Sequence, residues 1–201
     1  MKKFILVILG FSLCFACGNE TNKSDTALQQ EDKASTTTAS KAIPKPTDAA
    51  RKLANTTPLN EDVLVDLFPE TLLDMNRTTA GKGTLRARNA SGANAIYHGP
   101  DKKSMSIAIT DCAGVDGAKL YKRYSKYKTK KEDTENSTST TTYFSKNGME
   151  GKVIFIKSLN QHTLDLLYQD RLVMTIGATH IELNKIWEAI EVLPLSELLN
   201  Q

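Results

Sequence analysis

The chain contains few of the residues from which chemical sites are commonly built. Its 201 residues include three cysteines and only three histidines, His98, His162 and His180. No two histidines form a His-x-x-x-His pair, so the sequence predicts no local zinc site. The Gly-x-Ser-x-Gly elbow of many hydrolases and the Gly-x4-Gly-Lys-Ser/Thr phosphate loop are also absent. We therefore expect no metal, no cofactor and no enzymatic activity.

A strong charge of one sign is lacking as well. The formal net charge is +3, and residues 58–201 carry 18 basic and 18 acidic side chains. Nucleic-acid-binding domains typically present a pronounced basic surface. The balance of charge therefore argues against a nucleic-acid partner.

No apolar run is long enough to cross a bilayer, which takes about 20 residues. The longest, from Phe4 to Phe15, follows Lys2 and Lys3 and is typical of the apolar region of a signal peptide. It leads into Ala16-Cys17, a small residue before a cysteine, which resembles the lipobox of type II signal peptides. Cys14 and Phe15 depart from the usual residues before the small one.

The resemblance implies cleavage before Cys17, acyl chains on Cys17 and a bacterial lipoprotein. Residues 1–16 are then the signal peptide. Gly18 at the position after the cysteine resembles the pattern of lipoproteins sent to the outer membrane. The alternatives are an ordinary secretory signal with an incidental cysteine, and an uncleaved anchor.

Residues 17–57 have the composition of a flexible tether. They are rich in Ser, Thr, Asn, Lys and Ala, and contain the low-complexity run 35–40. Such a segment buries too little apolar surface to offset its ordering entropy. We expect a single folded domain to begin at Pro58 and to continue to Gln201, with at most a short helical turn before it at 48–53.

The cysteines predict no disulfide. Cys14 lies in the signal peptide and Cys17 is assigned to lipid, which leaves Cys112 without a partner in the chain. Cys112 follows an alternating apolar run, so we expect a buried, unreactive thiol. A reactive thiol is the alternative.

Hydrophobic periodicity predicts an α+β domain: one antiparallel sheet of six to seven strands, covered by two main helices. A short helix is expected after an Asn60 cap. Residues 80–83 are expected to form a turn. The main helices are expected at 113–128 and 181–192, and the strands at 71–79, 93–97, 105–111, 140–145, 153–157, 163–168 and 172–177.

The segment that precedes the helix at 113–128 contains two aspartates. Asp111 and Asp116 lack the alternating acids of a calcium loop, so we expect one of them to cap the helix. The helix itself predicts a basic face beside several tyrosines, which suits anionic lipid, lipopolysaccharide phosphates or an acidic protein. A solvated helix face is the alternative. The cations are Lys119, Lys122, Arg123, Lys126 and Lys130.

The order of these elements loosely resembles the PsbP-like fold. The residues that carry the resemblance are Phe68-Pro69 before a hairpin and the strand Ile107-Ala108-Ile109-Thr110-Asp111. It covers about 140 residues and contains no diagnostic motif. It implies a non-catalytic accessory or binding role and transfers no site residue.

The sequence therefore predicts a lipoprotein of the cell envelope, anchored to the outer membrane through Cys17, that binds or scaffolds another envelope component. One alternative is a periplasmic binder of a small hydrophobic ligand. Another is a hydrolase of envelope polymers, whose catalytic residues only folding would bring together.

Overall fold

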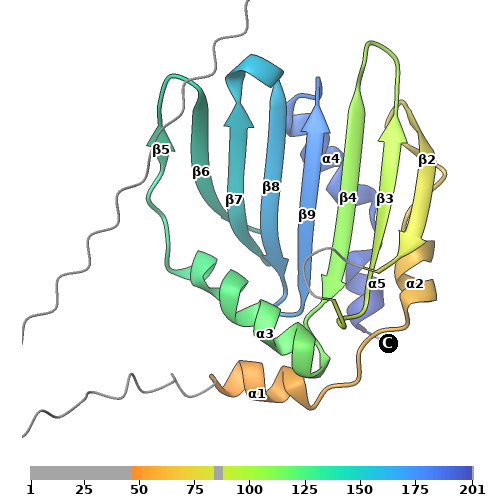
Figure 1. The fold of residues 1–201 in the computed structure, drawn as a ribbon, viewed down its shortest axis with the longest axis vertical. Helices are drawn as coiled ribbons and strands as arrows, with labels where there is room; N and C mark the ends of the chain where they lie inside the picture. Colours follow the sequence, from red (N-terminus) through yellow and green to blue (C-terminus); the bar gives the residue numbers. More distant parts are fainter. Residues whose placement is uncertain (1–46, 84–87, 201) are drawn as a thin grey trace, which may run out of the picture. The chain divides into compact units, whose positions relative to one another are not determined.

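The computed structural model describes residues 47–83 and 88–200, all within one compact unit, Pro44–Gln201. Nine strands and five α-helices follow one another as shown in Figure 1. The helices are α1 (Asp48–Ala54), α2 (Glu61–Asp66), α3 (Gly114–Tyr124), α4 (Leu183–Val192) and α5 (Leu195–Leu199). The strands are β1 (Thr71–Leu72), β2 (Met75–Lys82), β3 (Gly92–His98), β4 (Ser104–Asp111), β5 (Thr134–Glu135), β6 (Ser139–Lys146), β7 (Met149–Ile156), β8 (Gln161–Tyr168) and β9 (Leu172–Thr179).

All the strands lie in one antiparallel sheet, in the order β1-β2-β3-β4-β9-β8-β7-β6-β5. The chain thus makes two meanders, β1–β4 and β5–β9, which join where β4 pairs with β9. Ile107 lies opposite Ile176 at this central junction. The predicted α+β class and antiparallel sheet are confirmed.

The predicted number of strands was too small. Residues 71–79 were expected to form one strand, but they divide between β1 and β2 at a tight turn in which Leu73 has a φ of +56°. The pair Thr134–Glu135 forms β5 inside a stretch that reads as a polar loop. Both additions are two-residue strands, too short for a period-two pattern to reveal.

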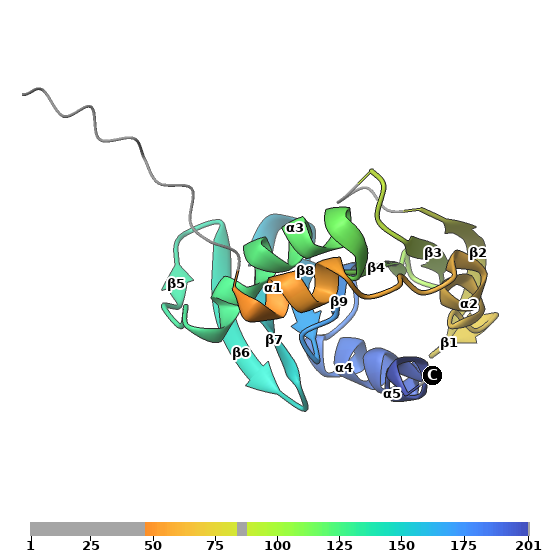
Figure 2. The ribbon, with the colours of Figure 1, turned by 90° about the horizontal axis from the view of Figure 1, so that it is seen from below.

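Helices cover both faces of the sheet, as Figure 2 shows: α1 and α3 lie on one side, and α4 and α5 on the other. Apolar side chains that alternate along the strands supply both cores. The larger core, which also takes in α2, contains Phe68, Ile107, Leu164, Ile176 and Ile186. The smaller core contains Leu53, Cys112, Leu120, Tyr124 and Val173.

Helix α1 belongs to this folded unit, although residues 48–54 were assigned to the tether. The Thr47 hydroxyl caps the helix by accepting a hydrogen bond from Ala50 N–H. Ala50 and Leu53 are buried in the smaller core. The packed part of the chain therefore starts before Pro58. The sequence of α1 does not reveal that the helix is packed, because only two of its side chains are buried in the core.

Two local expectations differ from the structure. Residues 80–82 continue strand β2 and pair with β3, with Ala80 opposite Ala95, so the turn predicted at 80–83 is wrong. Neither Asp111 nor Asp116 caps α3, whose N-cap is Ala113 and makes no side-chain hydrogen bond. The Asn60 side chain does cap α2, by accepting from Asp62 N–H.

Candidate ligand-binding groove

An apolar groove lies between α4 and the outer strands β6 and β7, on the face of the sheet that α4 covers in part. It has a volume of about 310 Å³, near the lower end of the range for small-molecule sites, about 300–1,000 Å³. None of its lining residues carries a formal charge at neutral pH when the histidine is neutral. The lining comes from β6 (Thr140, Thr142, Phe144), β7 (Val153, Phe155), β8 (His162) and α4 (Leu183, Trp187).

The pairing of the strands places these side chains beside one another. Thr140 lies opposite Phe155, and Phe155 lies opposite His162 on the next strand. Residues directly opposite in an antiparallel pair point to the same face. A row of three strands thus forms the floor, while α4 forms one wall.

His162 is the polar group within this apolar site. Its side chain is 8 % exposed, and the Phe155 ring stacks on it with centroids 4.5 Å apart. The backbone of Ile181 hydrogen-bonds the imidazole, whereas Nδ1 is buried and has no partner among the residues that the structure describes.

Burial lowers the pKa of His162, against smaller opposing effects of the Ile181 backbone and of the Glu182 charge. The ring is therefore neutral at neutral pH. In a neutral imidazole one nitrogen donates and the other accepts. Nδ1 is therefore a buried ring nitrogen without a partner among the described residues, a costly state in a protein interior.

Trp187 and Phe144 form the other aromatic pair of the groove. Their rings meet edge to face with centroids 4.9 Å apart. The Lys146 ammonium lies 5.3 Å from the Trp187 ring centroid and 3.5 Å from a Glu191 carboxylate oxygen. Phe144 packs against Gly151, where an added Cβ would approach the Phe144 ring to 2.8 Å. The absence of a side chain at Gly151 therefore allows the Phe144 ring to pack closely against strand β7.

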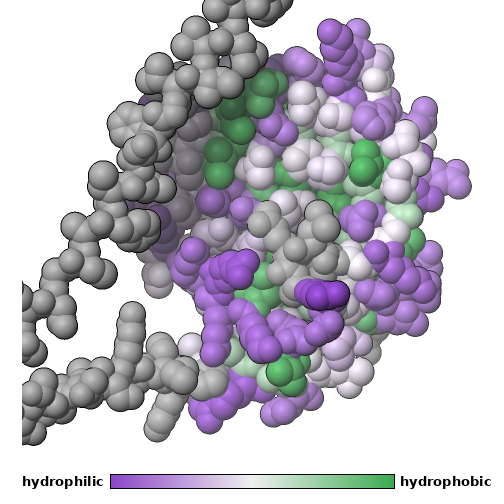
Figure 3. Space-filling view, in the orientation of Figure 1, coloured by the Kyte–Doolittle hydropathy of each residue, from purple (hydrophilic) through white to green (hydrophobic). Residues whose placement is uncertain are grey.

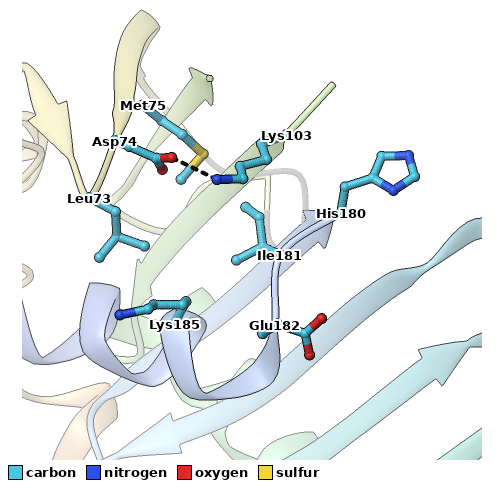
Figure 4. A pocket seen from close by; sticks show the side chains of 8 residues that line it. All are labelled: Leu73, Asp74, Met75, Lys103, His180, Ile181, Glu182 and Lys185. Atoms are coloured by element: carbon cyan, nitrogen blue, oxygen red, sulfur yellow. Dashed lines mark hydrogen bonds and ion pairs between the residues drawn. The ribbon is translucent and has the colours of Figure 1, made fainter. Parts of the chain in front are cut away.

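A second cleft, of about 370 Å³, lies near the start of α4 (Figure 4). Leu73, Asp74 and Met75 from the β1–β2 turn face Ile181 across it. Lys103 donates to Asp74 at 2.7 Å, and this bond lowers the pKa of Asp74.

Two more polar side chains of this cleft are engaged or turned outward. Lys185 pairs with Glu188 at 2.7 Å, and His180 points away from the cleft in Figure 4. The charged residues that line this cleft balance in sign, whereas the groove contains a buried nitrogen that has no partner among the described residues. The groove is therefore the stronger candidate for a ligand site.

The structure places the predicted cations on the exposed side of α3 and just beyond it, where hydrophilic side chains gather in Figure 3. The tyrosines expected beside them, Tyr121, Tyr124 and Tyr127, are buried instead. They hold α3 against the sheet, so the surface is basic but not aromatic. Cys17, the predicted lipid site, lies outside the described residues.

Helix α1 enlarges this surface, because it packs along α3 and exposes Arg51 and Lys52. Residues 48–54 and 114–131 together hold nine basic and two acidic side chains. Asp48 pairs with Arg51, and Asp116 pairs with Lys119 at 2.7 Å. We call the exposed cations of these two segments the basic layer: Arg51, Lys52, Lys119, Lys122, Arg123, Lys126, Lys128, Lys130 and Lys131.

Cys112 is fully buried in the smaller core, as expected. Burial, reinforced by the nearby Asp111 charge, raises the pKa of its thiol to about 12. The nucleophilic thiolate is therefore scarce at neutral pH, which agrees with a structural thiol.

Within residues 47–83 and 88–200, no three His, Cys, Asp or Glu side chains are grouped so as to hold a metal ion. In the same residues no helix is long and apolar enough to cross a membrane.

The sequence did not predict the groove, because its residues lie far apart in the chain. One signal was present: in Gln161-His162-Thr163-Leu164-Asp165-Leu166, His162 takes the position of the buried leucines. A histidine in the apolar phase of a strand marks a buried imidazole. Trp187 on the last helix is only half-buried.

Comparisons with known proteins add no relative. No protein-family model matches the chain, and no curated protein or solved structure matches it. The lipobox and PsbP-like resemblances therefore stay predictions.

Proposed function

We propose that this protein is a lipid-anchored, non-catalytic binding module of the cell envelope that binds a small apolar ligand in the groove beside α4. The anchor would be Cys17, and the outer membrane is the membrane that Gly18 favours. The chain segment that precedes α1 would then connect the membrane anchor to the folded unit that binds the ligand.

The groove carries this proposal. Phe144, Phe155 and Trp187 remain only half-buried there, although aromatic side chains contribute most when they are covered. An apolar site with one polar group is the usual form of a small-molecule pocket. Its lining offers no carboxylate, which supports binding rather than hydrolysis.

The anchor is tested by mass spectrometry of the mature N-terminus from membranes. We expect an N-terminal Cys17 with two or three acyl chains, which would make release from a membrane very slow. A Cys17→Ala variant should lose these chains and leave the membrane fraction. An unmodified terminus at another residue would refute the anchor.

The groove is tested with toluene as an apolar probe and residues 18–201, which contain every described residue and lack the predicted lipid site. Trp187 is the one tryptophan of the chain, so its fluorescence reports directly on the groove. We expect a saturable change with toluene. Thr142→Phe should weaken it by filling the groove, because Thr142 lines it.

Thr141→Phe is the matched control, since it puts the same ring on the opposite face of the same strand. It should leave toluene binding unchanged. No saturable change in the wild type, or equal loss in both variants, would show that the groove is not a ligand site.

A further inference from the structure

The unpartnered nitrogen of His162 specifies what kind of ligand the groove accepts. We infer that the groove selects a neutral, apolar ring compound with one hydrogen-bond donor, which His162 Nδ1 accepts. This inference rests on the proposed function, and it adds a chemical class to a site that would otherwise accept any apolar molecule of suitable size.

The protonation of the two ring nitrogens of His162 determines which group a ligand must bring. The Ile181 backbone favours an N–H on the imidazole, and Nδ1 is buried without a partner among the described residues. We therefore assign the proton of the neutral ring to Nε2 and a lone pair to Nδ1. A buried acceptor without a donor costs about 1–3 kcal/mol. A ligand that brings an O–H or N–H to Nδ1 recovers this cost, whereas a ligand without a donor leaves it in place.

The other lining residues determine the shape and the charge of the rest of the ligand. The three aromatic side chains and the two aliphatic ones, Val153 and Leu183, favour a flat apolar body. With no charged lining residue, a charged ligand would lose its hydration without gaining a partner. The selected ligand is therefore neutral, and a phenol or an indole is the simplest example of the class.

The Phe155 ring governs access to Nδ1. It stacks on the imidazole at an interplanar angle of 26° and is itself half-buried. Rotation of this ring costs less than movement of Leu164 or Ile176, which are fully buried in the larger core. We therefore expect the ligand's ring to displace Phe155 and to present its donor to the edge of the imidazole.

The test compares 4-methylphenol with 4-methylanisole, which has a methyl group in place of the donor hydrogen. Binding to residues 18–201 is followed through Trp187 fluorescence, with toluene as the reference. One recovered hydrogen bond predicts that 4-methylphenol binds about fivefold to tenfold more tightly than 4-methylanisole. In His162→Phe the preference for 4-methylphenol over 4-methylanisole should vanish.

A measurement on the wild-type protein tests the same hydrogen bond without depending on whether His162→Phe folds. The ¹⁵N resonance of His162 Nδ1 should shift on addition of 4-methylphenol and stay in place with 4-methylanisole. The inference is overturned if the two compounds bind with equal affinity, or if neither compound changes the ¹⁵N chemical shift of His162 Nδ1. If toluene still binds in that case, the proposed groove function stands, and if toluene also fails, both are refuted.

Discussion

Arg171 holds the buried carboxylate of Asp111 through two parallel hydrogen bonds, from Nε to Oδ1 and from Nη2 to Oδ2, each 3.0 Å long. The Asp111 side chain is fully buried, while that of Arg171 is 23 % exposed. The carboxylate also accepts from Leu59 N–H at 2.8 Å and from Ala113 N–H at 2.9 Å. Arg171 in turn donates to the Thr57 carbonyl. The pair thus ties the α1–α2 link to the end of β4.

Asp111→Asn should destabilise the domain by about 3 kcal/mol, the lower end of the range for breaking a buried ion pair. The lower end applies because water reaches part of the guanidinium. The amide group of the new side chain would also oppose N–H groups that now donate to a carboxylate. Urea denaturation of residues 18–201 measures the change.

Glu188→Gln provides the comparison, since the Glu188–Lys185 pair is exposed on α4. Exposed pairs contribute little, so its effect should stay below about 1 kcal/mol. Hydrogen exchange separates the roles further: in Asp111→Asn the amide of Leu59 should lose its protection. A stability loss equal to that of Glu188→Gln would show that the carboxylate is dispensable.

The Asp111 pair also shows where the sequence stops being informative. Strand β4 was predicted correctly because Met105, Ile107 and Ile109 alternate with smaller, more exposed residues. The role of Asp111 was not, because its partner Arg171 lies 60 residues away. A local cap was the nearest explanation for an aspartate before a helix.

The same limit applies to the groove and to α1. Phe144, Phe155, His162 and Trp187 come from four elements, and only the register of the sheet brings them together. Local patterns record which face a side chain takes, but not which distant strand lies next to it. Helix α1 was missed for a related reason, since its stability comes from packing on α3 rather than from its own seven residues.

Gly151→Ala should damage both stability and the groove. An added Cβ would lie 2.5 Å from the Asp165 carbonyl oxygen and 2.8 Å from the Phe144 ring, both closer than packing permits. Overpacking of this kind costs about 1–3 kcal/mol. Displacement of Phe144 would also break its edge contact with Trp187 and change the tryptophan emission.

Gly81→Ala is the matched control for this substitution. Gly81 also lies in a strand, but no atom lies within 4 Å of the position of its Cβ. It should leave the urea midpoint and the Trp187 emission nearly unchanged. Unchanged emission in Gly151→Ala would contradict the close packing of Phe144 on that glycine.

The stability of the domain should fall on mild acidification because of His162. Burial lowers the pKa of His162 in the folded state, while an unfolded histidine titrates near about 6.5. Between these two values the unfolded chain binds a proton that the folded chain does not, so stability decreases as the pH falls through this window. The slope there is at most about 1.4 kcal/mol per pH unit.

His162→Phe should flatten this part of the stability profile, measured by urea denaturation at a series of pH values. His98→Phe, a change at an exposed histidine, should keep it. Ion pairs with lysines lower the pKa values of Asp74 and Glu135, and these carboxylates affect stability only in more acidic solution, below their usual values of about 4. An unaltered profile in His162→Phe would exclude the buried imidazole as its cause.

Reversing part of the basic layer should weaken binding to anionic membranes. Lys122, Arg123 and Lys126 are exposed and form no ion pair with any residue in 47–83 or 88–200. Each basic side chain near an anionic surface contributes about 1 kcal/mol. Changing all three to Glu should therefore lower the affinity for liposomes that contain anionic lipid by roughly a hundredfold or more, and added salt should reduce the wild-type affinity in the same direction.

The control for this last prediction changes three exposed lysines outside the layer, Lys82, Lys102 and Lys157, to Glu. It gives the same net charge as the first variant but leaves the basic layer intact. Residues 18–201 are used for both, so that no lipid anchor masks the difference. If both variants lose affinity equally, net charge alone drives the binding. If neither loses it, the basic layer is a solvated surface, and contact with the membrane depends on the anchor at Cys17.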